Sequence, residues 1–159
     1  MSDKAVIFFS VSGVTKIAAA KIAKIAGADL IEIEPSEKYK EADVDWRNDK
    51  SRASKENADQ KIRPSIRNGE NSIDKYDTVF IGFPVWWGAE PRVVDSFLEV
   101  QNFDGKTVIP FATSGGSSID DSTKKLKKIV KGKVIWKEGK IITAQESDTD
   151  IGKWIRSVE

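Results

Sequence analysis

The sequence contains no histidine and no cysteine among its 159 residues. These absences exclude a histidine-based catalytic triad, a thiol nucleophile, a cysteine/histidine zinc site, a cysteine-bound iron–sulfur cluster and any disulfide framework. An enzyme of this composition would also lack the commonest general base. Any chemistry must therefore come from carboxylates, hydroxyl groups, lysines or a bound cofactor.

Long apolar runs are also missing. The longest nearly apolar run, Val79 to Ala89, has about half the length that a helix needs to span a bilayer. The apolar stretch that follows Lys4 covers only residues 5–9, which is too short for the core of a signal peptide. We therefore expect no membrane insertion and a cytoplasmic protein.

Charge of neither sign dominates, because 26 basic and 25 acidic residues leave a formal net charge of +1. This balance argues against nucleic acid as a partner. Residues 124–140 nevertheless carry eight lysines and one acid, whereas residues 73–123 carry three basic and eight acidic residues. The lysine-rich stretch is typical of a solvated helix face and a protected edge strand, with an anion or a nucleic acid as the alternative ligand.

Hydrophobic residues make up 39% and charged residues 32% of the chain, which is typical of one globular domain over residues 1–159. Strands are predicted at 5–9, 30–33, 78–83, 107–112 and 134–136, and helices at 16–26, 91–100, 119–130 and 146–158. This alternation predicts an α/β fold of three layers, with a doubly wound, five-stranded parallel sheet. Residues 36–72 form a long excursion, with a polar helix expected near residues 47–61.

Ligands of open parallel sheets bind beyond the carboxyl ends of the strands. Three loops leave such ends here, namely Ser10–Thr15, Pro84–Glu90 and Thr113–Ser118. The first is rich in hydroxyl groups and precedes a helix, whose free N–H groups and dipole favour a phosphate. The second holds Trp86 and Trp87 as a platform for a flat ring, and the third offers glycines and hydroxyl groups to a polar ring edge. Together these features describe flavin mononucleotide (FMN).

Each loop also has a plainer interpretation, as a helix cap, as core packing of tryptophan or as an ordinary turn. Adjacent residues of a regular element cannot both face inward, however, and Pro84 and Gly88 indicate a loop around Trp86 and Trp87. Other nucleotide motifs are missing, since neither Gly-x-Gly-x-x-Gly nor Gly-x4-Gly-Lys-Ser/Thr follows the first strand. The convergence of three loops on one sheet edge favours the flavin interpretation.

In these loops the sequence resembles the bacterial short-chain flavodoxins. The Ser10–Thr15 loop is similar to their Thr/Ser-x-Thr-Gly-x-Thr phosphate loop, and residues 83–88 and 113–116 resemble a branch with Phe-Pro-x-Trp-Trp-Gly and Thr-Ser-Gly-Gly loops. The resemblance covers Lys4 to Val158 and implies a flavodoxin-like strand order 2-1-3-4-5 with FMN at the switch point. It implies cofactor-binding residues in three groups, with no catalytic and no metal-binding residue. These are Ser10, Ser12, Gly13, Val14 and Thr15 at the phosphate, Pro84, Val85, Trp86, Trp87 and Gly88 along the ring, and Thr113, Ser114, Gly115, Gly116 and Ser117 at its polar edge.

Two features depart from that family. The third loop lacks the aromatic residue that usually stacks on the outer flavin face, which leaves Trp46, a substrate or a partner to cover it. The family's carriers are also usually strongly acidic, whereas here only residues 73–123 would form an acidic rim that lowers the redox potential. Residues 63–64, Arg-Pro, resemble an element of the same branch.

The function that the resemblance implies is that of a low-potential electron-transfer protein. Its expected partners are redox proteins that contain flavin or iron–sulfur centres, and the expected state is a monomer or weak dimer. An FMN-dependent NAD(P)H oxidoreductase, similar to a quinone reductase, is the alternative, and a binding or regulatory domain that has lost flavin is a third.

Overall fold

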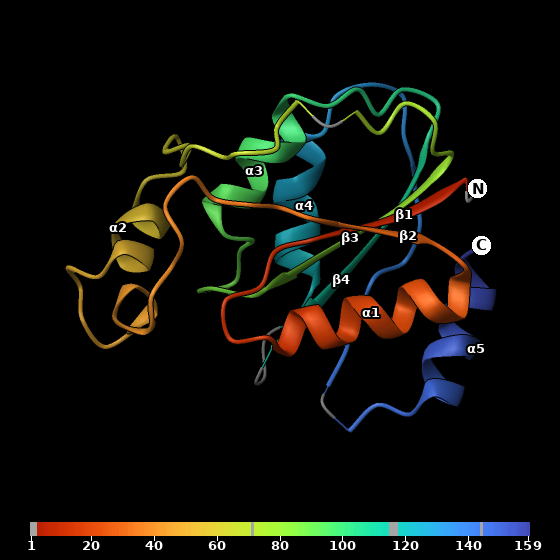
Figure 1. Ribbon diagram of the computed structural model, residues 1–159, viewed down its shortest axis with the longest axis horizontal. Helices are drawn as coiled ribbons and strands as arrows, with labels where there is room; N and C mark the ends of the chain where they lie inside the picture. Colours follow the sequence, from red (N-terminus) through yellow and green to blue (C-terminus); the bar gives the residue numbers. More distant parts are fainter. Residues whose placement is uncertain (1–2, 71, 115–117, 144) are drawn as a thin grey trace.

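The structure, a computed structural model, describes residues 3–70, 72–114, 118–143 and 145–159. Its parallel sheet has the order β2 (Asp29–Glu32), β1 (Lys4–Phe8), β3 (Thr78–Pro84), β4 (Thr107–Thr113) and β5 (Ile135–Trp136), with β6 (Lys140–Ile141) also paired to β4. The helices α1 (Val14–Ala26) and α5 (Asp148–Val158) cover one face, and α3 (Arg92–Glu99) and α4 (Asp120–Ile129) cover the other (Figure 1). The predicted three-layer fold and strand order are confirmed.

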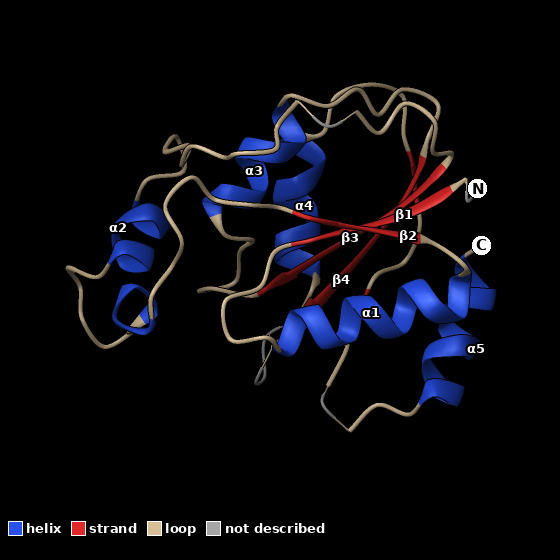
Figure 2. Cartoon of the chain, viewed as in Figure 1, coloured by secondary structure: helices blue, strands red, loops and turns tan. Residues whose placement is uncertain are grey.

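The central strands are buried on both faces, which explains their unbroken apolar runs. In β1, Ala5 and Ile7 belong to the core under α3 and α4, whereas Val6 and Phe8 belong to the core under α1 and α5. Ile7 stands in register with residues of both neighbouring strands, β2 and β3. The strands therefore hold their carboxyl ends at one edge of the sheet, as Figure 2 shows.

The fifth strand position is split, which the sequence analysis did not predict. The carbonyl of Val108 accepts a hydrogen bond from the segment that follows β5, and the carbonyl of Ala112 accepts one from the segment that follows β6. Pro110 lies midway between them on the same side of β4 and has no N–H group to donate. The ladder is therefore interrupted at Pro110, and two short strands replace one.

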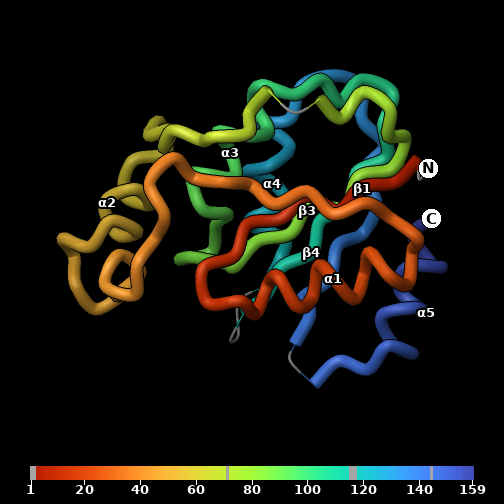
Figure 3. The backbone as a smooth tube through the Cα atoms, in the orientation of Figure 1, coloured from red at the N-terminus to blue at the C-terminus, as the bar shows by residue number. Residues whose placement is uncertain are grey.

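Between β2 and β3 the chain leaves the sheet in an excursion that contains the 3-10 helix η1 (Glu41–Val44) and α2 (Arg52–Ala58). Figure 3 shows this segment, orange to yellow, as a lobe at the side of the sheet. The predicted polar helix is thus present but shorter, and Ser51 caps its N-terminus, because the Ser51 hydroxyl accepts a hydrogen bond from the Ser54 N–H at 3.2 Å. The two ends of the excursion are tied together, because the Arg67 N–H donates to the Glu34 carbonyl at 2.7 Å.

The lysine-rich stretch follows α4 and the β5 edge, where Lys133 and Lys137 flank the two-residue strand. This placement is the one expected of a solvated helix face and a protected sheet edge. No helix in the described part of the chain is long and apolar enough to cross a membrane.

Candidate functional site

A cavity of about 380 Å³ opens where β1, β3 and β4 end, between the sheet and the excursion. Seven residues predicted from the sequence line it: Ser12, Thr15, Pro84, Val85, Trp86, Trp87 and Thr113. The excursion adds Val44, Trp46 and Ala53, and the first loop adds Val11. Among the residues that the structure describes, this lining has aromatic rings, methyl groups and hydroxyls but no ionisable side chain.

The first loop turns into α1 at Gly13, which has a φ of 96°. Such a conformation favours glycine, and a Cβ on Gly13 would meet no heavy atom within 4 Å. The Gly13 N–H donates to the Ser10 hydroxyl at 3.1 Å, so Ser10 shapes the turn and does not line the cavity.

The N-terminus of α1 differs from those of two other helices. Ser51 and Ser147 cap α2 and α5 with their hydroxyl groups, whereas no side chain in the described residues caps α1, and its first turn has no acidic residue. The N–H groups of that turn have no partner within the helix. Together with the helix dipole they form a binding surface for an anion such as phosphate.

A pair of threonines joins the first loop to the third. The Thr15 and Thr113 hydroxyl oxygens are 2.7 Å apart, and Thr15 is only 2% exposed. The Val85 N–H donates to the Thr113 carbonyl at 3.0 Å, which joins the second loop to the third as well. The three loops are therefore held together by hydrogen bonds before any ligand binds.

The second loop closes as a tight hairpin over residues 86–89. Trp86 and Ala89 exchange two backbone hydrogen bonds of 2.9 and 3.1 Å, and the residues between them, Trp87 and Gly88, have φ values of 50° and 72°. Two positive φ values define a type I′ turn, in which asparagine and glycine are favoured and a bulky residue is strained by about 1–3 kcal/mol. Trp87 is 46% exposed, so packing of its side chain offsets little of this backbone strain. A strained, exposed tryptophan beside a cavity indicates a binding function.

The two adjacent tryptophans point to different surroundings. Trp86 packs against Phe9 and Tyr39, with ring centroids 6.0 and 5.7 Å away. The Arg52 guanidinium lies 3.7 Å from the centroid of the Tyr39 ring, and the Tyr39 hydroxyl donates to the Glu56 carboxylate. Burial, followed by this hydrogen bond, raises the pKa of Tyr39 above its ordinary value, so it stays a proton donor. Trp86 is therefore partly a core residue, and Trp87 is the freer of the two.

Trp46 faces the same opening from the excursion. It is 70% exposed, and it lines both the main cavity and an adjoining groove of about 280 Å³. Trp87 lines both as well. The opening is thus bordered by one indole from the hairpin and one from the excursion.

A buried ionic network lies directly behind the hairpin. The Arg92 guanidinium is 3.1 Å from a Glu90 oxygen and 3.3 Å from an Asp95 oxygen, and all three side chains are buried. Arg63 of the excursion is 2.7 Å from Glu99 and 3.9 Å from Asp95. The network therefore fastens the returning end of the excursion to α3.

Two carboxylates of this network, Glu90 and Asp95, are buried, so they cannot contribute to an acidic rim formed by residues 73–123. Burial raises the pKa of Glu90 to about 8, with the charge of Asp95 adding to it and that of Arg92 opposing it. Burial also raises the pKa of Asp95 to about 6, against the charges of Arg92 and Arg63. Both groups therefore hold protons at higher pH than exposed carboxylates do.

The other predicted site residues lie beside the cavity or outside the described residues. Gly88 forms the hairpin tip, Val14 is the first residue of α1, and Ser114 follows β4. Gly115, Gly116 and Ser117 lie outside the described residues.

The sequence analysis did not assign Val11, Val44 or Ala53 to the site. Val44 and Trp46 are among the few large apolar residues of an otherwise polar excursion. Their isolation could have indicated a role in the site, because large apolar side chains in a polar segment usually pack against another surface.

Comparisons with known proteins agree with this geometry. The flavodoxin family model matches residues 3–158. A candidate flavoprotein from Bacteroides uniformis has a TM-score of 0.90 and 39% identity over 98% of each chain. Another, from Bacteroides eggerthii, has a TM-score of 0.88 and 41% identity over 99% of this chain and 98% of that one.

A more distant structure shares the fold. It is a flavoprotein from Lactobacillus acidophilus in complex with FMN, with a TM-score of 0.71 and 24% identity over 98% of this chain and 99% of that one. No curated protein sequence matches the chain.

Proposed function

Because the chain belongs to the flavodoxin family, we propose that it binds FMN in the 380 Å³ cavity and carries electrons at low potential between redox proteins. The proposal depends above all on three surfaces that meet in that cavity. They are the uncapped N-terminus of α1, the hydroxyl pair of Thr15 and Thr113, and the exposed ring of Trp87. The flavoprotein from Lactobacillus acidophilus, which shares the fold, supports FMN as the ligand.

Different residues would bind different parts of FMN. Ser12, Thr15 and the first-turn N–H groups of α1 would donate hydrogen bonds to the phosphate. Thr113, with the predicted but undescribed residues 115–117, would meet the polar edge of the ring. Trp86 and Trp87 would pack along the ring and exclude water from it. Bound FMN would supply the redox chemistry, and the protein would set its potential.

The described lining of this cavity contains no ionisable side chain, so redox chemistry there would depend on the bound flavin and not on general acid–base catalysis by a described residue. An FMN-dependent NAD(P)H oxidoreductase is the second candidate. It is favoured by the groove between Trp46 and Trp87, which would admit a flat substrate. The cytoplasmic location, the flavin- or iron–sulfur-containing partners and the monomeric or weakly dimeric state remain predictions.

FMN binding is tested by titrating the flavin-free full-length protein with FMN and with riboflavin, while flavin fluorescence is recorded. We expect saturable binding of one FMN per chain. We expect riboflavin, which lacks the phosphate, to bind at least about tenfold more weakly, because charge-assisted hydrogen bonds contribute roughly 1.5–3 kcal/mol each. A protein that binds neither ligand would overturn the proposal.

The second measurement separates the carrier from the enzyme. The FMN-loaded protein is mixed with NADH or NADPH and a quinone, without any added reductase. A carrier should leave the pyridine nucleotide unconsumed and should accept electrons only from a separate reductase or a chemical reductant. Steady consumption of NADH or NADPH would instead identify an oxidoreductase.

A further inference from the structure

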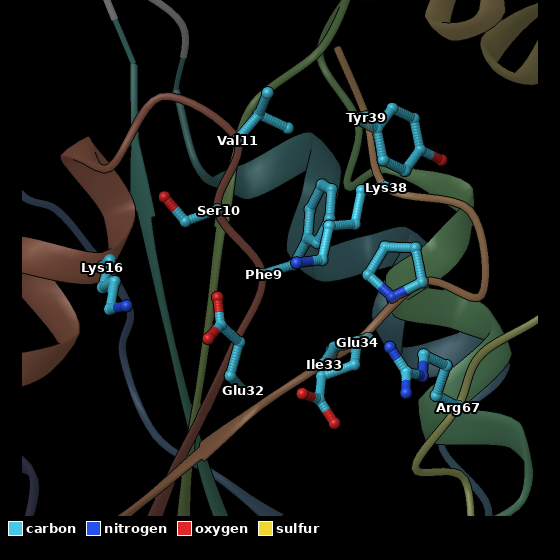
Figure 4. A pocket seen from close by; sticks show the side chains of 11 residues that line it. Phe9, Ser10, Val11, Lys16, Glu32, Ile33, Glu34, Lys38, Tyr39 and Arg67 are labelled. Carbon is cyan, nitrogen blue, oxygen red and sulfur yellow. The ribbon is translucent and has the colours of Figure 1, made fainter.

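A second cavity of about 330 Å³ lies between the ends of β1 and β2 and the start of the excursion. Figure 4 shows its lining. Five charged side chains surround it, three of them basic and two acidic: Lys16, Lys38, Arg67, Glu32 and Glu34. Phe9, Pro35 and Tyr39 form an apolar wall. Its chemistry is thus unlike that of the first cavity, whose described lining has no ionisable group.

The backbone around this cavity is held by hydrogen bonds. The Arg67 N–H donates to the Glu34 carbonyl at 2.7 Å. The Asn68 side chain bridges the opposite strand, since its amide donates to the Glu32 carbonyl at 2.6 Å and its oxygen accepts from the Glu34 N–H at 3.1 Å. The side chains of Glu32, Glu34 and Arg67 therefore project from a fixed framework.

The three basic side chains are not neutralised by ion pairs. None of the ion pairs in the described ranges involves Lys16, Lys38 or Arg67. In Figure 4 the Lys38 side chain reaches toward Phe9 at the centre of the cavity, with Lys16 on the α1 side and Arg67 on the opposite side. With Glu32 and Glu34 in the same lining, these three cations leave a formal net charge of +1, which favours an anion, and arginine and lysine both bind phosphate well.

The two carboxylates narrow the choice of ligand. A bare phosphate would be repelled by Glu32 and Glu34, whereas a ligand that also carries hydroxyl groups would donate hydrogen bonds to them. Glu32 ends β2 and Glu34 follows it, which is also where doubly wound dinucleotide-binding folds place the acid that holds a ribose.

We propose that this second cavity binds the sugar-phosphate part of a nucleotide, with Lys16, Lys38 and Arg67 on the phosphate and Glu32 and Glu34 on the sugar hydroxyls. The base would lie against the half-buried Pro35 and Tyr39, since Phe9 is only 2% exposed. This site goes beyond the flavin function, because its charged residues take no part in the first cavity, although Ser10 of the first loop lines the second. The two cavities share Val11 in their linings, so a nucleotide here would lie next to the flavin site.

The test is a calorimetric titration of the FMN-saturated full-length protein with AMP, adenosine and inorganic phosphate. FMN saturation keeps the probes out of the first cavity. We expect AMP to bind at least about tenfold more tightly than either adenosine or phosphate. Adenosine cannot make the phosphate contacts, and inorganic phosphate cannot make the sugar and base contacts. No binding of AMP, or phosphate binding as tight as that of AMP, would overturn the proposal.

Variants locate the binding. The double variant Lys38→Gln with Arg67→Gln should weaken AMP binding about tenfold or more, because two charge-assisted contacts are lost. The matched control, Lys55→Gln with Lys61→Gln, removes the same charge from exposed positions of the excursion outside the cavity and should change AMP binding less than about twofold. Equal weakening in both double variants would contradict the proposed site.

A second double variant tests the two carboxylates, Glu32 and Glu34. Glu32→Gln with Glu34→Gln should weaken AMP while tightening inorganic phosphate, since only the sugar needs the carboxylates. Tightening of both ligands would refute the sugar contact. If the protein does not bind FMN, the same titrations on the flavin-free protein still depend on Lys38 and Arg67, so failure of the flavin proposal is distinguishable from failure of this one.

Discussion

The proposed flavin cavity has two walls that are built differently. The wall contributed by the sheet consists of short loops at the ends of β1, β3 and β4, and a buried hydrogen bond joins Thr15 to Thr113 across it. The wall contributed by the excursion consists of Val44, Trp46 and Ala53, from a 3-10 turn, a loop and a seven-residue helix. The sheet wall is fixed by strand pairing, and the excursion wall rests on contacts between side chains. We infer that the first recognises the cofactor and the second controls its exposure.

Two sets of contacts join the walls. Arg52 lies over the Tyr39 ring, which in turn packs on Trp86 of the hairpin. On the other side of the excursion, Arg63 reaches Glu99 and Asp95 of α3. The excursion is therefore attached at both ends of its lobe, and its tryptophan has a defined place at the opening.

The largest expected effect comes from breaking the sheet wall at Gly13. Gly13→Val forces a β-branched residue into positive φ and fills the space beside the α1 N-terminus. We expect FMN affinity to fall about 100-fold or more, as expected when one or two charge-assisted hydrogen bonds to the phosphate are lost. The measurement is the fluorescence titration with FMN.

A matched control separates this effect from backbone strain. Gly105 also has a positive φ, 81°, with no heavy atom within 4 Å of a Cβ, and it does not line the cavity. Gly105→Val should lower stability to a similar extent and leave FMN affinity within about twofold. Unchanged affinity in Gly13→Val would show that the phosphate binds elsewhere.

The second effect concerns the ionic network behind the hairpin. The pKa of Glu90 is raised from 4.5 to about 8, so the folded state keeps a proton that the unfolded state has already lost. The stability that this proton provides is complete below about pH 4.5 and is lost as pH rises through 8. We expect the free energy of unfolding to fall by on the order of 4 kcal/mol between pH 5 and pH 9, at about 1.4 kcal/mol for each pH unit over which the proton difference persists.

Urea denaturation at pH 5, 7 and 9 measures this loss. Glu90→Gln removes the titrating group, so its unfolding free energy should depend less on pH than that of the wild type. Glu138→Gln changes an exposed carboxylate of the same kind and should keep the wild-type slope. A Glu90→Gln variant with that same slope would show that Glu90 does not titrate in this range.

The fold was predictable because its signals are local. Apolar runs buried on both faces identified the strands, and the range predicted for the fourth, 107–112, differs by one residue from the observed Thr107–Thr113. The split of the fifth strand was not predictable, since it depends on which side of β4 lacks the Pro110 N–H. The burial of Glu90 and Asp95 was not predicted for a similar reason. The charge pattern in and around α3 does not distinguish a buried carboxylate from one exposed at the rim of the site.

The site was predictable to the extent that it lies on the sheet. Three loops that follow buried strands necessarily meet at one edge, and their linings include seven of the predicted residues. The excursion wall was harder, because no periodicity in residues 36–72 determines where the chain folds back. Only Trp46 was considered in advance, as a cover for the outer ring face.

The third effect distinguishes ligand contact from strain at Trp87. Trp87→Asn places a residue that tolerates positive φ in the type I′ turn, so stability should rise by about 1 kcal/mol. FMN affinity should fall about tenfold, because the ring surface is lost. Urea denaturation and FMN titration measure the two quantities. The control Trp87→Phe retains an aromatic ring and the strained turn, so it should change stability and FMN affinity little. If Trp87→Asn gains stability without losing affinity, Trp87 does not touch FMN.

The smallest effect is expected on the excursion wall, at Trp46. This side chain is 70% exposed and has no strained backbone to relieve, so Trp46→Asn should leave the free energy of unfolding unchanged. FMN affinity should fall only about threefold, because the sheet wall still holds the phosphate and the ring edge. Quenching of bound flavin by iodide should nevertheless increase, since Trp46 borders the opening. If Trp46→Asn costs as much affinity as Trp87→Asn, both walls recognise the cofactor equally, and the assignment of exposure control to the excursion is wrong.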